Sequence, residues 1–340
     1  MASSFGNRVL TTTQDKMLAK VVDTVLNGNV LATRMLSKAK KWSGEQMKFP
    51  IKYQKGVSGQ AFTGYDTLST SASDTRVKLV FDPKFYSAPV SLPLTELSVN
   101  DTDSKVIDLM AVELESRAQD IADDIGTYFY GTDTDNSKEF MGLADIVDDG
   151  SVKTTYGELL RATYTGLNST LTASGGTLTL DKMATLYNAI TSGSQKPTLG
   201  LTTEAIFSLY EKLLTPQERM TKDVSVVKSG LTGGTGYTAL FYKGMPIIAD
   251  EKCTSGVLFF LNEDYLDWYA LPMAETTPIN FSSKDIEGND YSSVKGLGFS
   301  WSNWIKPSNQ AALVGQIYLG GQLLSKNPKR HGKLTGITTV

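Results

Sequence analysis

Residues 44–94 read GEQMKFPIKYQKGVSGQAFTGYDTLSTSASDTRVKLVFDPKFYSAPVSLPL. Apolar and polar residues alternate on both sides of a Gly-, Ser- and Thr-rich stretch at 56–73, and this period of two is typical of β-strands. The sequence therefore predicts a long two-armed hairpin. Its prolines each remove a ladder hydrogen bond, which favours edge or isolated strands; they are Pro50, Pro83, Pro89 and Pro93. Since an isolated two-stranded ribbon is marginal in water, we expect a partner chain to cover it.

The strongest helical pattern runs from Thr102 to Tyr130. Its apolar residues recur at steps of three and four, Asp101 and Thr102 are suitable N-caps, and Gly131 stands where a helix-ending glycine belongs. At 1.5 Å per residue such a helix spans about 40 Å. Residues 101–130 carry eight acidic and two basic side chains. We expect a long acidic helix.

The rest of the chain predicts a basic arm and an α/β layer. The first 41 residues carry seven basic and two acidic side chains, with a short amphipathic helix pattern at 17–26. Helices are expected at 180–190 and at 203–214, the second ended by Pro216. Strands are expected at 198–202, 244–251, 257–261, 299–305 and 311–324. The fold class is α+β.

Composition argues against several functional classes. A net charge of −3 gives no basic field of the kind that a dedicated nucleic-acid reader needs. Cys253 is the only cysteine, so neither an intrachain disulfide nor a thiolate metal cluster can form. The start lacks a charged-then-apolar signal pattern, and no stretch approaches the roughly 18 apolar residues of a membrane-spanning helix. We expect a soluble protein made in a cytoplasm, with no membrane partner.

The order of these elements resembles that of the tailed-phage major capsid proteins, which share the Hong Kong 97 coat fold. The order is a basic arm, a long Gly-tipped hairpin, a long acidic helix, paired short helices, a GMPIIADE strand (244–251) and a terminal NPKRHGKL (327–334). Supporting phrases are FTGYDTL (62–68), GLADIVDDG (142–150) and FFLNEDYL (259–266). The resemblance covers essentially the whole chain. It is architectural, because none of these phrases is a chemically specific fingerprint.

The resemblance implies an HK97-like arrangement of five parts. They are an N-terminal arm (1–43), an extended hairpin loop (44–94), a peripheral domain with a spine helix (95–178), an axial domain (179–310) and a return to the peripheral domain (311–340).

The implied function is that of a coat protein. It would assemble into hexamers and pentamers of an icosahedral head, in the virion, around double-stranded DNA that it contacts non-specifically. A portal and decoration proteins would be further partners. Some relatives begin with a long scaffolding segment, for which there is no room here before the arm, so we expect a separate scaffold or none.

Opposite charges suggest how neighbouring chains would meet. Residues 44–94 carry six basic and four acidic side chains, so the basic hairpin of one chain is expected to rest on the acidic spine helix of the next. In the Gly-rich tip, Phe62 and Tyr65 are expected to anchor the hairpin on the neighbour. The expected contact residues are Lys52, Lys55, Phe62, Tyr65, Arg76, Lys78, Glu113, Glu115 and Asp120.

The sequence indicates no catalytic, cofactor or metal site. His331 is the sole histidine and lies in a basic run without an acidic neighbour, so packing or electrostatics suits it better than catalysis. The segment GLTGGTGY (230–237) lacks the spacing of a phosphate loop. Asp133, Asp135 and Asn136 resemble the start of a calcium loop but lack its glycine and its final glutamate.

Two other residue groups have ordinary structural explanations. The acidic pairs Asp123/Asp124 and Asp148/Asp149 are expected to be solvated carboxylates of a helix and a turn. The aromatic group is expected to be sheet core and not a stacking platform for bases; it comprises Trp268, Tyr269, Trp301 and Trp304.

Two other functions stay open. One is an encapsulin-like bacterial compartment shell, which DNA or cargo enzymes inside the particle would separate from a phage head. The other, from a different class, is a small-molecule hydrolase, which would need a pocket with perturbed titratable groups. Megadalton particles would favour a shell, and a monomer or dimer would favour the enzyme.

Overall fold

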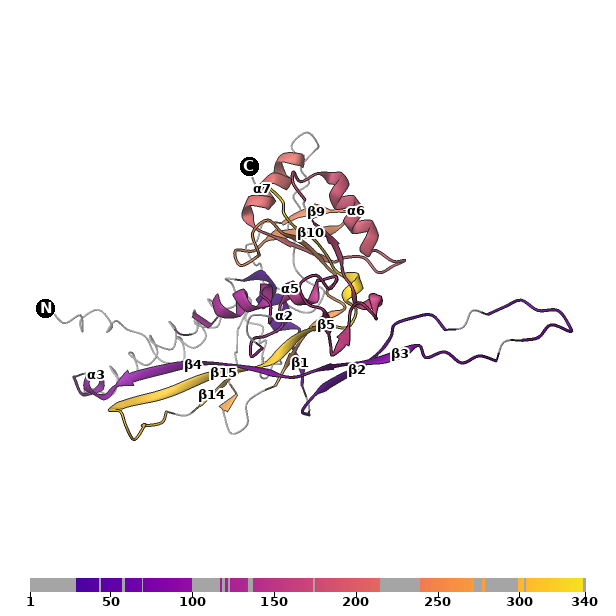
Figure 1. Cartoon of the computed structure of the whole chain (residues 1–340). Helices are drawn as coiled ribbons and strands as arrows, with labels where there is room; N and C mark the ends of the chain where they lie inside the picture. The colour runs from indigo at the N-terminus through magenta and orange to yellow at the C-terminus, as the bar shows by residue number, and fades with distance from the viewer. Residues whose placement is uncertain are drawn as a thin grey trace, which may run out of the picture.

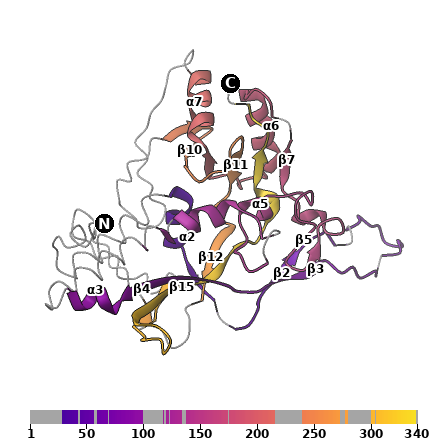
Figure 2. The same ribbon diagram turned by 60° about the vertical axis from the view of Figure 1, so that its left-hand side comes forward.

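A computed structural model shows a body of two sheets with two extensions, a hairpin on one side and the paired strands β4 (Lys84–Pro93) and β15 (Ala312–Ser325) on the other (Figures 1 and 2). The described residues are 29–42, 44–56, 59–68, 70–99, 117, 120–121, 123–133, 137–173, 175–214, 239–271, 277–278, 299–302 and 304–338. Helix and strand are mixed throughout, as the α+β class predicts.

The first sheet is built around β15. Its strand order is β1 (Lys40–Lys41), β12 (Leu266–Ala270), β15, β14 (Phe299–Trp301) and β13 (Thr277–Pro278), and β4 pairs with β15 over ten residues. Alternate β4 side chains are buried from Ala88 to Leu92. A helix that includes 123–130 contributes buried Ile125 and Phe129 to this core, and the Phe129 ring lies 5.2 Å from that of Trp268.

The second sheet is covered by two helices. Its order is β7 (Thr170–Thr172), β16 (Gly332–Leu334), β11 (Leu258–Leu261), β8 (Leu199–Thr202), β10 (Met245–Ala249) and β9 (Ala239–Tyr242). Helices α6 (Leu180–Ile190) and α7 (Glu204–Leu214) pack their apolar faces on it and enclose a second core. Helix α6 confirms the predicted helix at 180–190, and β8 confirms the predicted strand at 198–202. Helix α7 confirms the predicted helix at 203–214, starting one residue later than predicted.

The hairpin is shorter than predicted. Only β2 (Met47–Lys52) and β3 (Arg76–Phe81) pair with each other. The prediction that residues 84–94 belong to the same hairpin is wrong, because β3 ends at Phe81 and β4 pairs with β15 instead. An alternating segment can pair with any strand of matching register, so the period alone does not choose the partner. Pro89 and Pro93 do lie on an edge strand, because among the described strands β4 pairs with β15 alone.

Short elements connect these parts. They are α2 (Val30–Ser37), α3 (Leu94–Val99), α5 (Leu143–Ile146), β5 (Thr155–Tyr156), β6 (Leu159–Leu160), η2 (Thr165–Leu167) and η3 (Pro328–Arg330). The helix α2 buries Leu31, Met35 and Leu36, and Asn29 caps it by accepting from the Ala32 N–H at 3.0 Å. The start of the described chain is therefore part of the core.

The sheets do not follow the predicted domain limits. Within the predicted axial range 179–310, β12 and β14 belong to the sheet of β15, whereas β16 from the predicted peripheral return joins the sheet of β8. The five-part division stays a prediction, and these strands cross it.

The long helix is described in part. Residues 117, 120–121 and 123–130 are helical, and the N–H of Gly131 donates to the carbonyls of Thr127 and Tyr128, which confirms the predicted C-terminal end. The predicted beginning at 101–102 and the predicted helix at 17–26 lie outside the described residues. Among the described helices, none combines the length and apolar character that crossing a bilayer requires.

Candidate assembly surface

The hairpin stem has one basic face. Directly paired residues of antiparallel strands share a face, so the register places six side chains on the outward side of the stem. They are Lys48, Pro50, Lys52, Arg76, Lys78 and Val80. Four are cations and none is acidic. Lys52 lies directly opposite Arg76, an arrangement that destabilises an isolated ribbon, so this face is suited to an anionic partner.

The opposite face of the stem fixes the hairpin to the body. We call this contact the root. The Phe49 ring lies 5.5 Å from that of Tyr269, and the Phe81 ring 5.2 Å from that of Tyr156. The Val80 N–H donates to the Gly157 carbonyl at 3.2 Å. The root therefore belongs to the core of the body, and the basic face points away from it.

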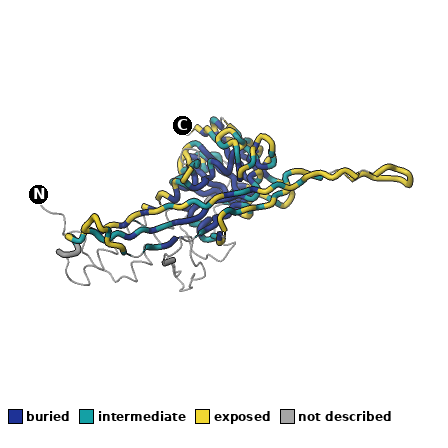
Figure 3. Tube along the Cα trace, turned by 60° about the horizontal axis from the view of Figure 1, so that its bottom comes forward, coloured by how far each residue is buried: buried dark blue, intermediate teal, exposed yellow. Residues whose placement is uncertain are grey.

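The hairpin tip carries exposed apolar side chains, and Figure 3 shows that the whole distal part of the hairpin is exposed. The side chains of Phe62, Tyr65 and Leu68 are exposed to 63%, 106% and 50%. Asp66 is the only charged residue between 59 and 73, and its carboxylate accepts from the Thr63 N–H at 2.8 Å, so it holds the turn. Exposed aromatic side chains grouped in this way are typical of an interaction site.

Asp120, an expected contact residue, and the neighbouring Asp123 and Asp124 of the long helix have partners within the chain. Arg117 bonds Asp120 at 3.1 Å, Lys252 lies 2.6 Å from Asp123, and the Tyr86 hydroxyl donates to Asp124. The Asp120 and Asp123 side chains are nevertheless 58% and 66% exposed. Since both carboxylates remain exposed, this part of the long helix presents negative charge that a neighbour's basic hairpin would attract.

The structure places seven of the nine expected contact residues. Lys52, Lys55, Phe62, Tyr65, Arg76 and Lys78 all lie exposed on the hairpin, and Asp120 lies exposed on the long helix. Within one chain the two groups belong to different elements. Glu113 and Glu115 lie outside the described residues, and the contact between chains stays a prediction.

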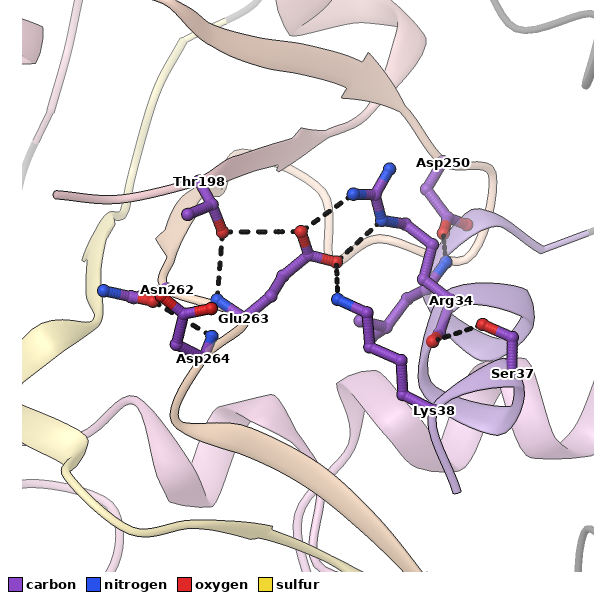
Figure 4. A network of polar contacts seen from close by, with 9 residues as sticks. Arg34, Ser37, Lys38, Thr198, Asp250, Asn262, Glu263 and Asp264 are labelled. Atoms are coloured by element: carbon purple, nitrogen blue, oxygen red, sulfur yellow. Dashed lines mark hydrogen bonds and ion pairs between the residues drawn. The ribbon is translucent and has the colours of Figure 1, made fainter. Parts of the chain in front are cut away.

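The basic arm is tied down by a carboxylate that the sequence analysis did not single out. Figure 4 shows Arg34 and Lys38 reaching from α2 to Glu263. The guanidinium bonds both carboxylate oxygens, at 2.7 and 2.8 Å, and the Lys38 Nζ lies 3.4 Å away. Burial raises the pKa of Glu263, but the hydrogen bonds and charges of Arg34 and then Lys38 outweigh burial and hold the pKa below its ordinary value. In the same way, Lys40 pairs with Asp267 at 2.6 Å.

Asp148 corrects the expectation of a solvated pair. Its side chain is wholly buried, and it accepts from the backbone N–H groups of Gly150, Val152 and Lys153. Burial raises its pKa, but these hydrogen bonds together lower the pKa below the ordinary value. Asp149 is exposed as expected. The pair therefore shapes a turn and does not form an acid–base dyad.

His331 comes close to a catalytic arrangement but has the wrong tautomer for it. Its Nε2 lies 2.8 Å from the Ser325 hydroxyl, the geometry of a nucleophile and its base. However, its Nδ1 accepts from the Asn262 N–H at 3.2 Å, so the ring proton is on Nε2 and points to Ser325. Burial lowers the pKa of His331 to about 3. The ring with this tautomer cannot take the serine proton, and its two hydrogen bonds link the end of β15 to the end of β11.

The remaining candidates are structural or lie outside the described residues. Asp133 pairs with Lys153, whereas Asp135, Asn136 and the Gly-rich segment 230–237 lie outside the described residues. Among the side chains that the structure describes, no three His, Cys, Asp or Glu gather as a metal site would need. The aromatic group is sheet packing as expected: Trp268 and Tyr269 are buried in β12, and Trp301 packs on Trp304 with centroids 5.2 Å apart.

No protein-family model matches this sequence, and no curated protein matches it either. Solved structures do match. The cyanophage A-1(L) capsid aligns with a TM-score of 0.67 at 16% identity, over 91% of this chain and 92% of that one. The chain has the Hong Kong 97-like coat fold. The resemblance inferred from element order is thereby confirmed at the level of the fold.

Two further structures share this coat fold. The holo-SrpI encapsulin of Synechococcus elongatus PCC 7942 aligns with a TM-score of 0.58 at 11% identity, over 91% of this chain and 88% of that one. The capsid of the native GTA particle gives the same TM-score and identity, with 90% of each chain covered. The fold thus occurs both in phage capsids and in an encapsulin.

Proposed function

We propose that this chain is the major capsid protein of a tailed bacteriophage, forming hexamers and pentamers of an icosahedral head around double-stranded DNA. The hairpin carries the proposal. It projects from the body with a one-sided basic stem and an exposed aromatic tip, which a free-standing monomer would have no reason to present to water. The coat fold supports this function, because shell proteins of the same fold are multi-subunit assemblies.

The neighbouring copy supplies the partner that the stem needs. Exposed carboxylates on the long helix of a second copy would meet the basic face and relieve the repulsion between Lys52 and Arg76. Because one end of the molecule would contact a different surface on the next copy, the contact is heterologous, and it forms rings where the rotation between copies closes. Rings of this kind are the capsomers of the proposed head.

The other partners follow from this role. A portal, decoration proteins, a separate scaffold and non-specific contact with packaged DNA belong to the same proposal, as do a place in the virion and synthesis in the host cytoplasm. A net charge of −3 suits contact with DNA by local patches more than by a general basic field.

An encapsulin-like compartment is the second candidate, favoured by the match to the holo-SrpI encapsulin. A hydrolase is disfavoured by the tautomer of His331, which donates its proton toward Ser325. The test is to purify native particles and treat them with nuclease before opening them. Protected double-stranded DNA supports the phage head, protein cargo without DNA supports the compartment, and a monomer or dimer that never assembles contradicts both.

A further inference from the structure

A turn on the body supports the hairpin just outside its root. The turn, residues 160–167, carries Tyr164, whose ring meets the Tyr53 ring edge-on with centroids 5.0 Å apart. Gly166 also lies beside the hairpin, since a Cβ at that position would be 3.4 Å from the Tyr53 carbonyl oxygen, an ordinary contact distance. We call this turn the ledge.

The ledge is held rigidly from within the body. The Arg161 side chain is wholly buried, and its Nη1 donates to the Leu167 carbonyl at 2.7 Å, which closes the ledge from its first to its last residues. The Arg161 Nη2 donates to the Asp145 carbonyl at 2.6 Å, outside the ledge. Displacing the ledge would strip a buried charged group of its acceptors, so Tyr164 is a fixed point.

Tyr53 is fastened to both arms of the hairpin. Its N–H donates to the Thr75 carbonyl at 3.1 Å and its hydroxyl to the Asp74 carbonyl at 3.0 Å. Gln54 bonds the same Asp74 carbonyl at 2.7 Å. The two arms therefore move together wherever the Tyr53 ring is held.

Two contact points fix the direction of a rod. The hairpin contacts the body at the root and at the Tyr53–Tyr164 pair. Beyond these two contacts, every described residue from 59 to 74 is exposed. A fully extended chain from Tyr53 to Gly64 would span about 36 Å at 3.3 Å per residue, so a tilt of about 10° at the ledge would displace its far end by about 6 Å. That is larger than the separation of about 4 Å at which two apolar side chains are in contact.

We propose that the contact between Tyr53 and Tyr164 sets the direction of the hairpin, and thereby the angle between neighbouring subunits and the size of the particle. This inference rests on the proposed shell function, because only an arm that holds a neighbour can set an angle. Tyr164 and Arg161 act as positioning residues. Neither needs to touch the neighbouring copy.

The test compares particles formed by Tyr164→Ala and by Tyr164→Phe, which keeps the ring. Electron microscopy of unstained particles measures their diameters. Tyr164→Ala should raise the share of particles outside the main size class about fivefold, the population change that loss of one aromatic contact produces, and Tyr164→Phe should match the wild type. Identical size distributions for Tyr164→Ala and the wild type would overturn the proposal.

A second measurement does not depend on assembly. Spin labels on Ala61→Cys in the tip and on Asp181→Cys in α6 give a distance that reports the hairpin direction in the unassembled chain. The native Cys253 is buried, and burial raises the pKa of its thiol and slows its labelling. Tyr164→Ala and Tyr53→Ala should each broaden the distance distribution. If wild-type chains never form particles, the proposed shell function is wrong, whatever the distances show. If the distance distribution is unchanged in both variants, the Tyr53–Tyr164 contact does not set the hairpin direction.

Discussion

Lys52 and Arg76 face each other directly across the outward side of the β2–β3 stem. Like charges in a directly opposed pair destabilise a sheet, so the stem presents its cations at the expense of its own stability. On the other side of the same two strands, Phe49 and Phe81 pack into the body. The stem is therefore built with one face for the fold and one face for an anionic partner.

Reversing the charge of the basic face should block assembly while the monomer stays folded. The variant is Arg76→Glu with Lys78→Glu, at two exposed positions. Each exposed ion pair contributes only about 0 to 1 kcal/mol, but loss of electrostatic steering should slow assembly about tenfold or more at low salt. Light scattering follows the rate, and circular dichroism checks the fold.

Two exposed lysines on the second-sheet side of the body supply the matched control, Lys196→Glu with Lys212→Glu. It makes the same charge change away from the hairpin and should assemble as the wild type does. Adding Glu113→Lys and Glu115→Lys to the reversed hairpin should restore part of the rate. Normal assembly of the reversed hairpin across a range of low salt would rule out a charge-guided contact.

Removing the aromatic tip should weaken finished particles more than the monomer. Phe62→Ala with Tyr65→Ala deletes two rings that are exposed in the single chain, so the free energy of unfolding of the monomer should be nearly unchanged. If a neighbour buries them, each ring contributes about 2 kcal/mol per contact. Particle heat stability measures the effect, and Val152→Ala, an exposed valine on the body, is the control. Unchanged heat stability would show that the tip has no anchoring role.

Gly157 should be intolerant of a side chain because it supports the hairpin root. It has φ +55°, and a Cβ there would lie 2.7 Å from the Leu79 Cδ2. Gly193 has φ +58° and nothing within 4 Å, so Gly193→Ala measures the backbone strain alone, about 1 kcal/mol. Gly157→Ala should lower the free energy of unfolding by about 1 to 3 kcal/mol more than that control. Equal losses in chemical denaturation would mean that the root tolerates the methyl group.

The ion pairs of Glu263 should make the stability of the chain sensitive to acid. Its pKa in the folded chain is lowered below the ordinary value of about 4.5, so its contribution is present above pH 4.5 and is lost as the pH falls through the folded pKa. Glu263→Gln should cost about 2 to 3 kcal/mol at pH 7. The variant should also lose less stability than the wild type between pH 5 and pH 3. Parallel stability–pH curves for the two proteins would contradict the assignment.

Sequence patterning was sufficient wherever a period matched one face of an element. The helix predicted at 180–190 buries Met183, Leu186, Tyr187 and Ile190 on one face, and the strand predicted at 198–202 is found as β8. The sequence pattern did not predict which strands pair. Strand β4 alternates as regularly as β3 does, but it pairs with β15, more than 200 residues later in the chain. Register and partner depend on the whole sheet, which a local period does not contain.

The burial of charged side chains was also not predicted from the sequence. Arg161 and Asp148 occupy a stretch that reads as a polar turn, but both are buried against the backbone: the Arg161 Nη1 and Nη2 donate to carbonyls, and the Asp148 carboxylate accepts from N–H groups. No side-chain pairing in the sequence signals such an arrangement. In contrast, the charges of the hairpin were read correctly as exposed, because a strand period places Lys52, Arg76 and Lys78 on the face opposite the apolar residues.

The most direct test of the shell function is an electron cryomicroscopy reconstruction of the assembled protein at a resolution that shows side chains. We expect closed shells in which each hairpin lies across the next copy, with Arg76 and Lys78 within ion-pair distance of that copy's carboxylates and Phe62 and Tyr65 buried. Two results would contradict this account: particles in which the hairpin folds back on its own body, or basic residues of the stem that point away from every neighbouring long helix.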